Sequence, residues 1–143
     1  MIPYHCNEAT LLLPNVRSCV DLSRQRVEVV TEDGAEITLI IARALLTSAL
    51  DLSASVEADV ADRRRSLRGF ELHSATEREY PELIGVEARL SFIDAQRGRL
   101  FHHEFHCVVE QLRMGYYAIC RFEHAGQCDA WIETVLQNLR LRV

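Results

Sequence analysis

Apolar and polar positions alternate along most of the chain, and this period of two predicts a protein built mainly from β-strands. The alternation is clearest over 84–92, where one face would carry Val86, Ala88, Leu90 and Phe92. Runs of the same kind predict strands at 9–13, 19–22, 26–31, 36–42, 70–74, 99–109 and 115–122. Segment 32–34 is Glu-Asp-Gly and should form a hairpin turn, because Asp-Gly tolerates the positive φ angles that such turns need.

Two segments show helical spacing instead. The first is predicted over Ser53–Arg68, with Ser53 as N-cap and Gly69 as the stop signal. Its inward positions would be Val56, Val60 and Leu67, whereas the charge run 63–65 should lie on the solvated outer face. The second helix is predicted over 127–138, after a break at 123–126, and its inward residues would be Trp131, Ile132, Val135 and Leu139. Segment 77–82 is polar and contains a proline, so we predict a connection there.

Helices inserted between antiparallel strands indicate an α+β architecture. The expected fold is one domain over 1–143, with a twisted antiparallel sheet and two helices packed on it. We expect both helices on one face of the sheet, which leaves the other face wet or free for binding.

Composition narrows the function classes. The chain has 143 residues, 48% of them hydrophobic, and a net charge of −5, which argues against a nucleic-acid surface. Five cysteines without a Cys-x-x-Cys pair make a disulfide framework improbable. The first residues resemble no signal peptide, and no apolar run reaches the roughly 18 residues of a membrane span. We therefore expect a cytoplasmic protein without stable membrane insertion.

The densest cluster of candidate ligands is the segment His102-His103-Glu104-Phe105-His106. On a strand, His102, Glu104 and His106 project to the same side, where they could hold a divalent metal in a small metal-dependent enzyme. The competing interpretation is a polar sheet face that needs hydrogen bonds or solvent. The opposite face should be core, with Phe101, Phe105, Cys107 and Val109. No nucleophile elbow, phosphate loop or dinucleotide fingerprint occurs, so we predict no enzymatic activity and no cofactor.

The order of motifs over nearly the whole chain resembles the DcrB-related family. The chain opens with Tyr4-x-x-Asn7-Glu8-Ala9-x-Leu11-x-Leu13-Pro14. A strand containing Ile40-Ile41-Ala42-Arg43 follows, and the first helix ends in Leu67-Arg68-Gly69-Phe70-Glu71-Leu72. Two long strands and a tryptophan-bearing final helix complete the pattern.

The cytoplasmic branch of that family includes the Eag chaperones of bacterial type VI secretion. The resemblance implies a DcrB/Mog1-like fold and a homodimer that holds the N-terminal hydrophobic helices of an effector, of the Rhs type for example, in a sheet-lined groove. It also implies help in loading the effector onto the secretion spike, without catalysis. A DcrB-like domain with another protein partner remains an alternative.

The resemblance also suggests which residues would contact the effector helix. The aliphatic pair on the second strand corresponds to Val20 and Leu22, and the leucine before Gly-Phe corresponds to Leu67. Two family glutamines, one on the helix and one on a strand, correspond to Asp59 and Glu104. Both positions are acidic here, so the polar contacts to the client are changed.

Overall fold

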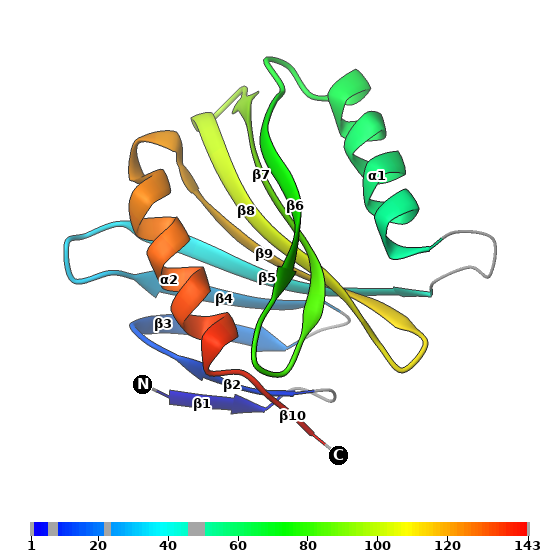
Figure 1. Cartoon of the computed structure of the whole chain (residues 1–143). Coiled ribbons are helices and arrows are strands. Elements are labelled where there is room, and N and C mark those ends of the chain that lie inside the picture. The colour runs from blue at the N-terminus through cyan, green and yellow to red at the C-terminus, as the bar shows by residue number, and fades with distance from the viewer. Residues whose placement is uncertain (1, 6–8, 22–23, 46–50, 143) are drawn as a thin grey trace.

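The computed structural model describes residues 2–5, 9–21, 24–45 and 51–142, and it confirms the α+β fold (Figure 1). The strands are β1 (Ile2–His5), β2 (Ala9–Leu13), β3 (Val16–Asp21), β4 (Gln25–Val30), β5 (Glu36–Leu45), β6 (Glu71–Glu79), β7 (Ile84–Asp94), β8 (Gly98–Val109), β9 (Leu112–Arg121) and β10 (Arg140–Leu141). The helices are α1 (Leu52–Ser66), the short 3-10 helix η1 (Phe122–His124) and α2 (Ala125–Gln137).

Two antiparallel sheets organise these strands. The larger has seven strands in the order β3-β4-β5-β9-β8-β7-β6, and the smaller has the order β1-β2-β10. The β4–β5 hairpin confirms the predicted turn, because Gly34 has φ 87° and its N–H donates to the Thr31 carbonyl at 2.9 Å. The large sheet twists and curves, so its two faces offer differently shaped surfaces (Figure 1).

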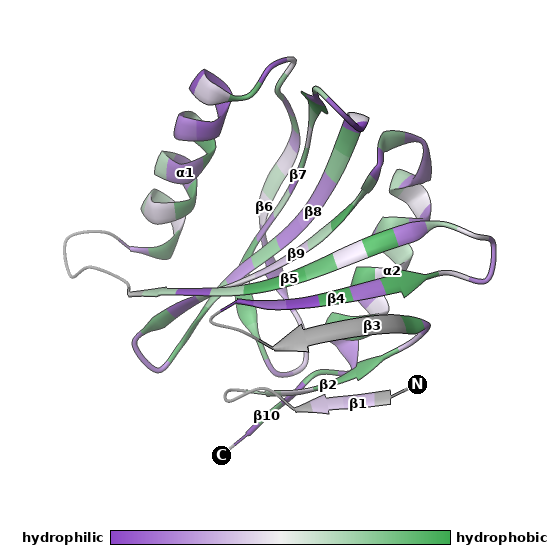
Figure 2. Cartoon of the chain, turned by 180° about the vertical axis from the view of Figure 1, so that it is seen from behind, coloured by the Kyte–Doolittle hydropathy of each residue, from purple (hydrophilic) through white to green (hydrophobic). Residues whose placement is uncertain are grey.

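The two helices lie on opposite faces of the large sheet, so the prediction that they share one face is wrong. Glu104 of β8 bonds to Arg63 of α1, whereas its neighbour His103 bonds to Asp129 of α2. Successive side chains of a strand point to opposite faces, so the two helices must as well. Figures 1 and 2, which view the molecule from opposite sides, show α2 in front of the sheet in one and behind it in the other.

The main core lies between α2, the small sheet and the face of the large sheet that α2 covers. The predicted inward residues of the last helix, Trp131, Ile132, Val135 and Leu139, are all buried there. Cys107, Cys120 and Cys128 are also buried as free thiols, and burial raises the pKa of Cys107 to about 12. These cysteines therefore act as small apolar side chains.

A smaller apolar contact holds α1 on the other face, where Val56 and Val60 pack against Val86 of β7. The predicted alternation of β7 is confirmed, because Val86, Ala88, Leu90 and Phe92 are all buried on this side. Neither helix is long and apolar enough to cross a membrane, as far as the described residues go.

Four predicted boundaries differ from the structure. The N-cap of α1 is Asp51, whose Oδ1 accepts the Ala54 N–H at 2.7 Å, and Ser53 lies inside the first turn. The helix ends at Ser66, before Gly69 with φ 62° turns the chain into β6. Strand β6 then continues to Glu79, into the segment 77–82 predicted as a connection, and the predicted break at 123–126 is helical.

Candidate functional site

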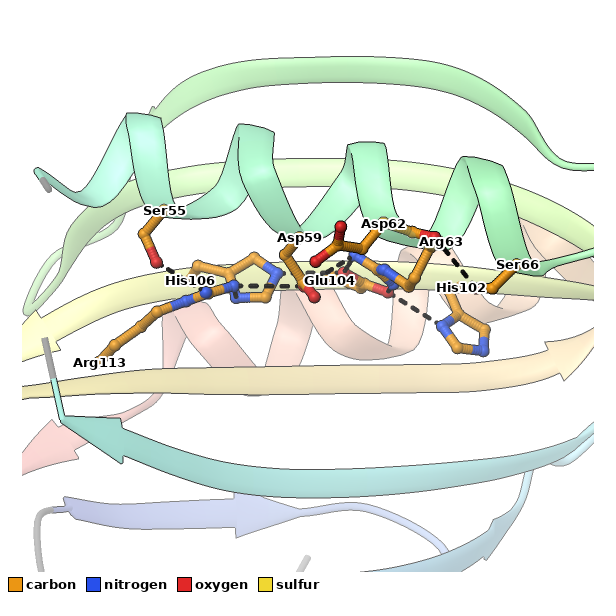
Figure 3. A network of polar contacts seen from close by, with 9 residues as sticks. All are labelled: Ser55, Asp59, Asp62, Arg63, Ser66, His102, Glu104, His106 and Arg113. Atoms are coloured by element: carbon orange, nitrogen blue, oxygen red, sulfur yellow. Dashed lines mark hydrogen bonds and ion pairs between the residues drawn. The ribbon is translucent and has the colours of Figure 1, made fainter.

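Glu104 of β8 is the centre of a polar cluster under α1 (Figure 3). Its neighbours His102 and His106 project to the same side, as predicted, but this side is covered by α1 and is not a solvated face. The Glu104 and His106 side chains are fully buried, and the His102 side chain is 14% exposed. A carboxylate at such a depth needs nearly complete hydrogen bonding.

Four donated hydrogen bonds satisfy the Glu104 carboxylate. Arg63 of α1 binds it with both terminal nitrogens, Nη1 to Oε2 and Nη2 to Oε1 at 2.8 Å. His102 Nδ1 lies 2.9 Å from Oε2, and His106 Nε2 lies 3.0 Å from Oε1. Burial alone would raise the pKa of Glu104, but the hydrogen bonds from His102, His106 and Arg63 outweigh it and hold that pKa well below its usual range. Glu104 is therefore ionised.

The cluster extends along the inner face of α1. Arg63 also pairs with Asp59 one turn earlier, at 3.3 Å, and Arg113 of β9 donates to Ser55 at 2.9 Å. We call the whole set the α1 network; its members are Ser55, Asp59, Arg63, His102, Glu104, His106 and Arg113. The α1 network connects α1 to β8 and β9, where the apolar contact between the helix and the sheet is small.

The contacts fix the protonated nitrogen of His106. Arg113 Nη2 lies 3.1 Å from His106 Nδ1, and a guanidinium can only donate, so Nδ1 must accept. The proton of a neutral His106 therefore sits on Nε2, which donates it to Glu104. The Tyr117 ring packs edge-on against this imidazole, with 5.2 Å between ring centroids.

This arrangement is built for charge pairing and opposes a bound cation. The imidazole nitrogens that would ligate a metal point at Glu104, and the guanidinium of Arg63 already neutralises that carboxylate. Within the described residues, no group of three His, Cys, Asp or Glu side chains is placed to hold a metal ion.

Of the five predicted effector-binding residues, the structure brings two into the α1 network. Glu104 lies at its centre, and Asp59 lies at its rim with a side chain that is 37% exposed. Leu67, the C-cap of α1, is half-buried and packs against Leu90, Phe92 and Leu100. Val20 belongs to β3, opposite Arg26, but its side chain lies outside the described residues, as does all of Leu22.

Arg63 and Arg113 were not predicted as site residues. The sequence did carry a signal for Arg63, because it follows Val56 and Val60 at helical spacing and precedes Leu67 by four residues. The prediction that the run 63–65 lies on the solvated face is wrong for Arg63, whose side chain is only 17% exposed, whereas that of Arg65 is 71% exposed. No local pattern marked Arg113.

Next to the α1 network, the same face of the sheet carries partly exposed apolar side chains. Ile40 of β5 pairs with Tyr117 of β9, and Ile119 follows two residues later on the same face. All three are half-buried, because α1 packs on β7 and β8 and neither described helix seals this part of the sheet (Figure 2). We call Ile40, Tyr117 and Ile119 the open strip.

A second polar cluster fastens α2 to the opposite face. His103 Nδ1 lies 2.6 Å from Asp129, its Nε2 lies 3.2 Å from Glu87, and Arg89 binds Asp129 through two nitrogens. Burial lowers the pKa of His103, but its attraction to Asp129 and Glu87 outweighs this effect and raises the pKa overall. We call these four residues the α2 network.

Comparisons with known proteins establish the fold alone. No family model matches the chain, and no curated protein matches it. Among solved structures, PA94 of Pseudomonas aeruginosa, a protein of unknown function, superposes with a TM-score of 0.74 at 16% identity, over 100% of this chain and 98% of that one.

Two further structures share the architecture. LpqN of Mycobacterium tuberculosis, which is involved in cell envelope biogenesis, gives a TM-score of 0.67 at 10% identity, over 99% of this chain and 90% of its own. PsbP of the cyanobacterium Synechocystis gives a TM-score of 0.56 at 9% identity, over 84% of this chain and 87% of its own. The three proteins differ in what is known of them, so the likeness assigns no function.

Proposed function

We propose that this protein is an adaptor-chaperone of type VI secretion that shields N-terminal hydrophobic helices of an effector and aids its loading on the secretion spike. The sequence resemblance to the Eag chaperones motivates this proposal. The observation that carries it is the open strip, because apolar side chains remain accessible on a sheet face beside a helix rich in charge.

The physics of the task fits such a surface. A membrane-spanning helix exposes about 20 apolar residues, which would drive aggregation if left in water. A carrier must therefore bury that helix against apolar side chains and satisfy its polar groups. Ile40, Tyr117 and Ile119 offer the first kind of contact, and Asp59 at the rim of the α1 network offers the second.

The geometry refines the roles of the residues that the resemblance suggested. Glu104 has its four acceptor positions filled by Arg63, His102 and His106, so in the proposal it acts through Arg63 and makes no direct contact with the client. Leu67 would contribute its exposed part only. Val20 and Leu22 stay in the proposal as predicted contacts; Val20 belongs to β3, which β4 separates from the open strip on β5 and β9.

The proposal includes a cytoplasmic homodimer without enzymatic activity. No contact described above favours the alternative of a metal-dependent enzyme, because Arg63 holds the position that a cation would take. A DcrB-like domain with another protein partner is the outcome to expect if hydrophobic helices do not bind.

Co-expression with an effector fragment tests the proposal. The fragment would come from a neighbouring gene and carry N-terminal apolar helices; we expect it to stay soluble and to co-purify. Ile40→Glu places a charge in the open strip and should lower the yield of complex by about tenfold or more. The matched control is Ile84→Glu, because Ile84 is 67% exposed at the far end of β7.

An unchanged yield with Ile40→Glu, from a variant that melts like the wild type, would refute the assignment of the open strip. Failure of the fragment to become soluble with the wild-type chain would refute the chaperone role itself. Light scattering of the purified chain measures the expected homodimer independently.

A further inference from the structure

On the other side of α1 lies a second apolar surface. A groove of about 440 Å³ separates α1 from β6. Its apolar lining comes from both elements and from β7, with Val56, Val60, Leu72, Ala75 and Val86. We call it the β6 groove; it is separate from the open strip, which lies toward β9 and β5.

The groove runs beside an unpaired strand edge. Strand β6 is the outermost strand of the large sheet, and among the described strands it pairs only with β7. An outer edge of nine residues presents backbone N–H and C=O groups that can pair with another extended chain. Such an added strand would point every second side chain toward α1, into the groove.

Charged side chains stand at the two ends of the groove. Glu57 of α1 and Glu77 of β6 line one end, and Arg64 of α1 lies toward the other, where its guanidinium stands 5.1 Å above the Phe70 ring. All three are exposed, and none has an oppositely charged partner within the described part of the chain. The groove is therefore acidic at one end, apolar in the middle and basic at the other end.

We propose that the β6 groove and the β6 edge together bind an extended polypeptide segment, which joins the sheet as an eighth, antiparallel strand. The order of charges sets its sequence. The chain reverses between α1 and β6, so the acidic end of the groove lies beside the end of β6 (Figure 1). An antiparallel strand enters at that end, so it should read basic-x-apolar-x-apolar-x-acidic, with these residues facing α1.

A labelled peptide, Thr-Lys-Thr-Val-Thr-Val-Thr-Glu-Thr, tests this inference by fluorescence anisotropy with the full chain. We expect saturable binding, and about tenfold weaker binding of the peptide with Lys and Glu exchanged, the sum expected of three exposed charge pairs. The combined variant Glu57→Lys, Glu77→Lys, Arg64→Glu should reverse this preference. The control Glu123→Lys changes an exposed charge on η1 and should leave both affinities unchanged.

N-methylation of the peptide separates strand addition from simple filling of the groove. An added strand directs alternate amides at β6, so methylating one alternating set should abolish binding and methylating the other set should preserve it. Equal effects of the two sets would overturn the proposal, as would no saturable binding up to roughly 1 mM. A dimer of the free chain that dissociates on Glu77→Lys would also overturn it, because a second copy would then occupy the edge.

Discussion

At the scale of the residue, the buried Glu104 depends on one arginine. His106 donates to it as a neutral imidazole, because its Nδ1 accepts from Arg113, whereas the guanidinium of Arg63 brings a permanent positive charge to the carboxylate. A buried ion pair adds little net stability compared with an apolar pair, but removal of one partner leaves an uncompensated charge. The cost of a substitution here should therefore depend on whether one or both residues change.

We expect Arg63→Ala to lower the free energy of unfolding by about 3 kcal/mol, because Glu104 would remain buried without its counter-charge. The double variant Arg63→Met, Glu104→Gln should recover most of that loss, because a neutral amide can still bond to both histidines. Denaturant unfolding of the wild type and the two variants measures both values. A double variant as unstable as Arg63→Ala would mean that packing, not charge, sets the cost.

At the scale of the element, α1 is held by local features as much as by apolar contact. Only Val56 and Val60 are buried along its 15 residues, and the helix otherwise meets the sheet through the α1 network. Its start relies on the cap made by Asp51, and its basic last turn suits the helix dipole.

Asp51→Ala should therefore cost about 1 kcal/mol of stability, and hydrogen exchange should quicken first in the opening turn of α1. Ser53→Ala is the matched control and should be nearly neutral, although the sequence alone favoured Ser53 as the cap. A larger loss from Ser53→Ala than from Asp51→Ala would contradict the capping geometry.

The elements also show how far sequence alone can go. The hairpin at Gly34, the alternation of β7 and the inward face of α2 were predictable, because each depends on local spacing. The full length of β6 could not be predicted, because an outer strand with exposed side chains needs no alternation of apolar and polar residues. For the site, spacing placed His102, Glu104 and His106 together, but only the tertiary fold brings Arg63 and Arg113 to them.

At the scale of the whole molecule, the large sheet has a polar network on each face, and both networks titrate. The pKa of His103 is raised above its ordinary 6.5, so its stabilising effect is complete below pH 6.5 and is lost as the pH rises through the raised value. Net of burial, hydrogen bonds lower the pKa values of Glu87 and Glu104 below 4.5, so their contribution is present above 4.5 and lost in acid.

Stability should therefore be greatest between about pH 5 and 6.5 and should fall on both sides. Denaturant midpoints measured from about pH 3 to 8 check this, because the acid loss lies below 4.5 and the range ends below the ordinary thiol pKa of 9.0. His103→Gln should flatten the decline between pH 6.5 and 8, and it should also weaken the acid limb, because His103 helps to lower the pKa values of Glu87 and Asp129. A wild-type midpoint that stays constant from pH 6 to 8 would exclude the role assigned to His103.

The alternation of β8 between the two networks has a consequence for folding errors. If β8 slipped by one residue against its neighbours, every side chain would change sides. In the slip that moves Glu104 into the place of His103, this carboxylate would lie beside Asp129 and Glu87, so like charges would be buried together. Phe105 would then take the place of Glu104 and leave Arg63 without its counter-charge. The paired charges thus help to select the correct strand register, because a sheet with β8 misaligned would be unstable.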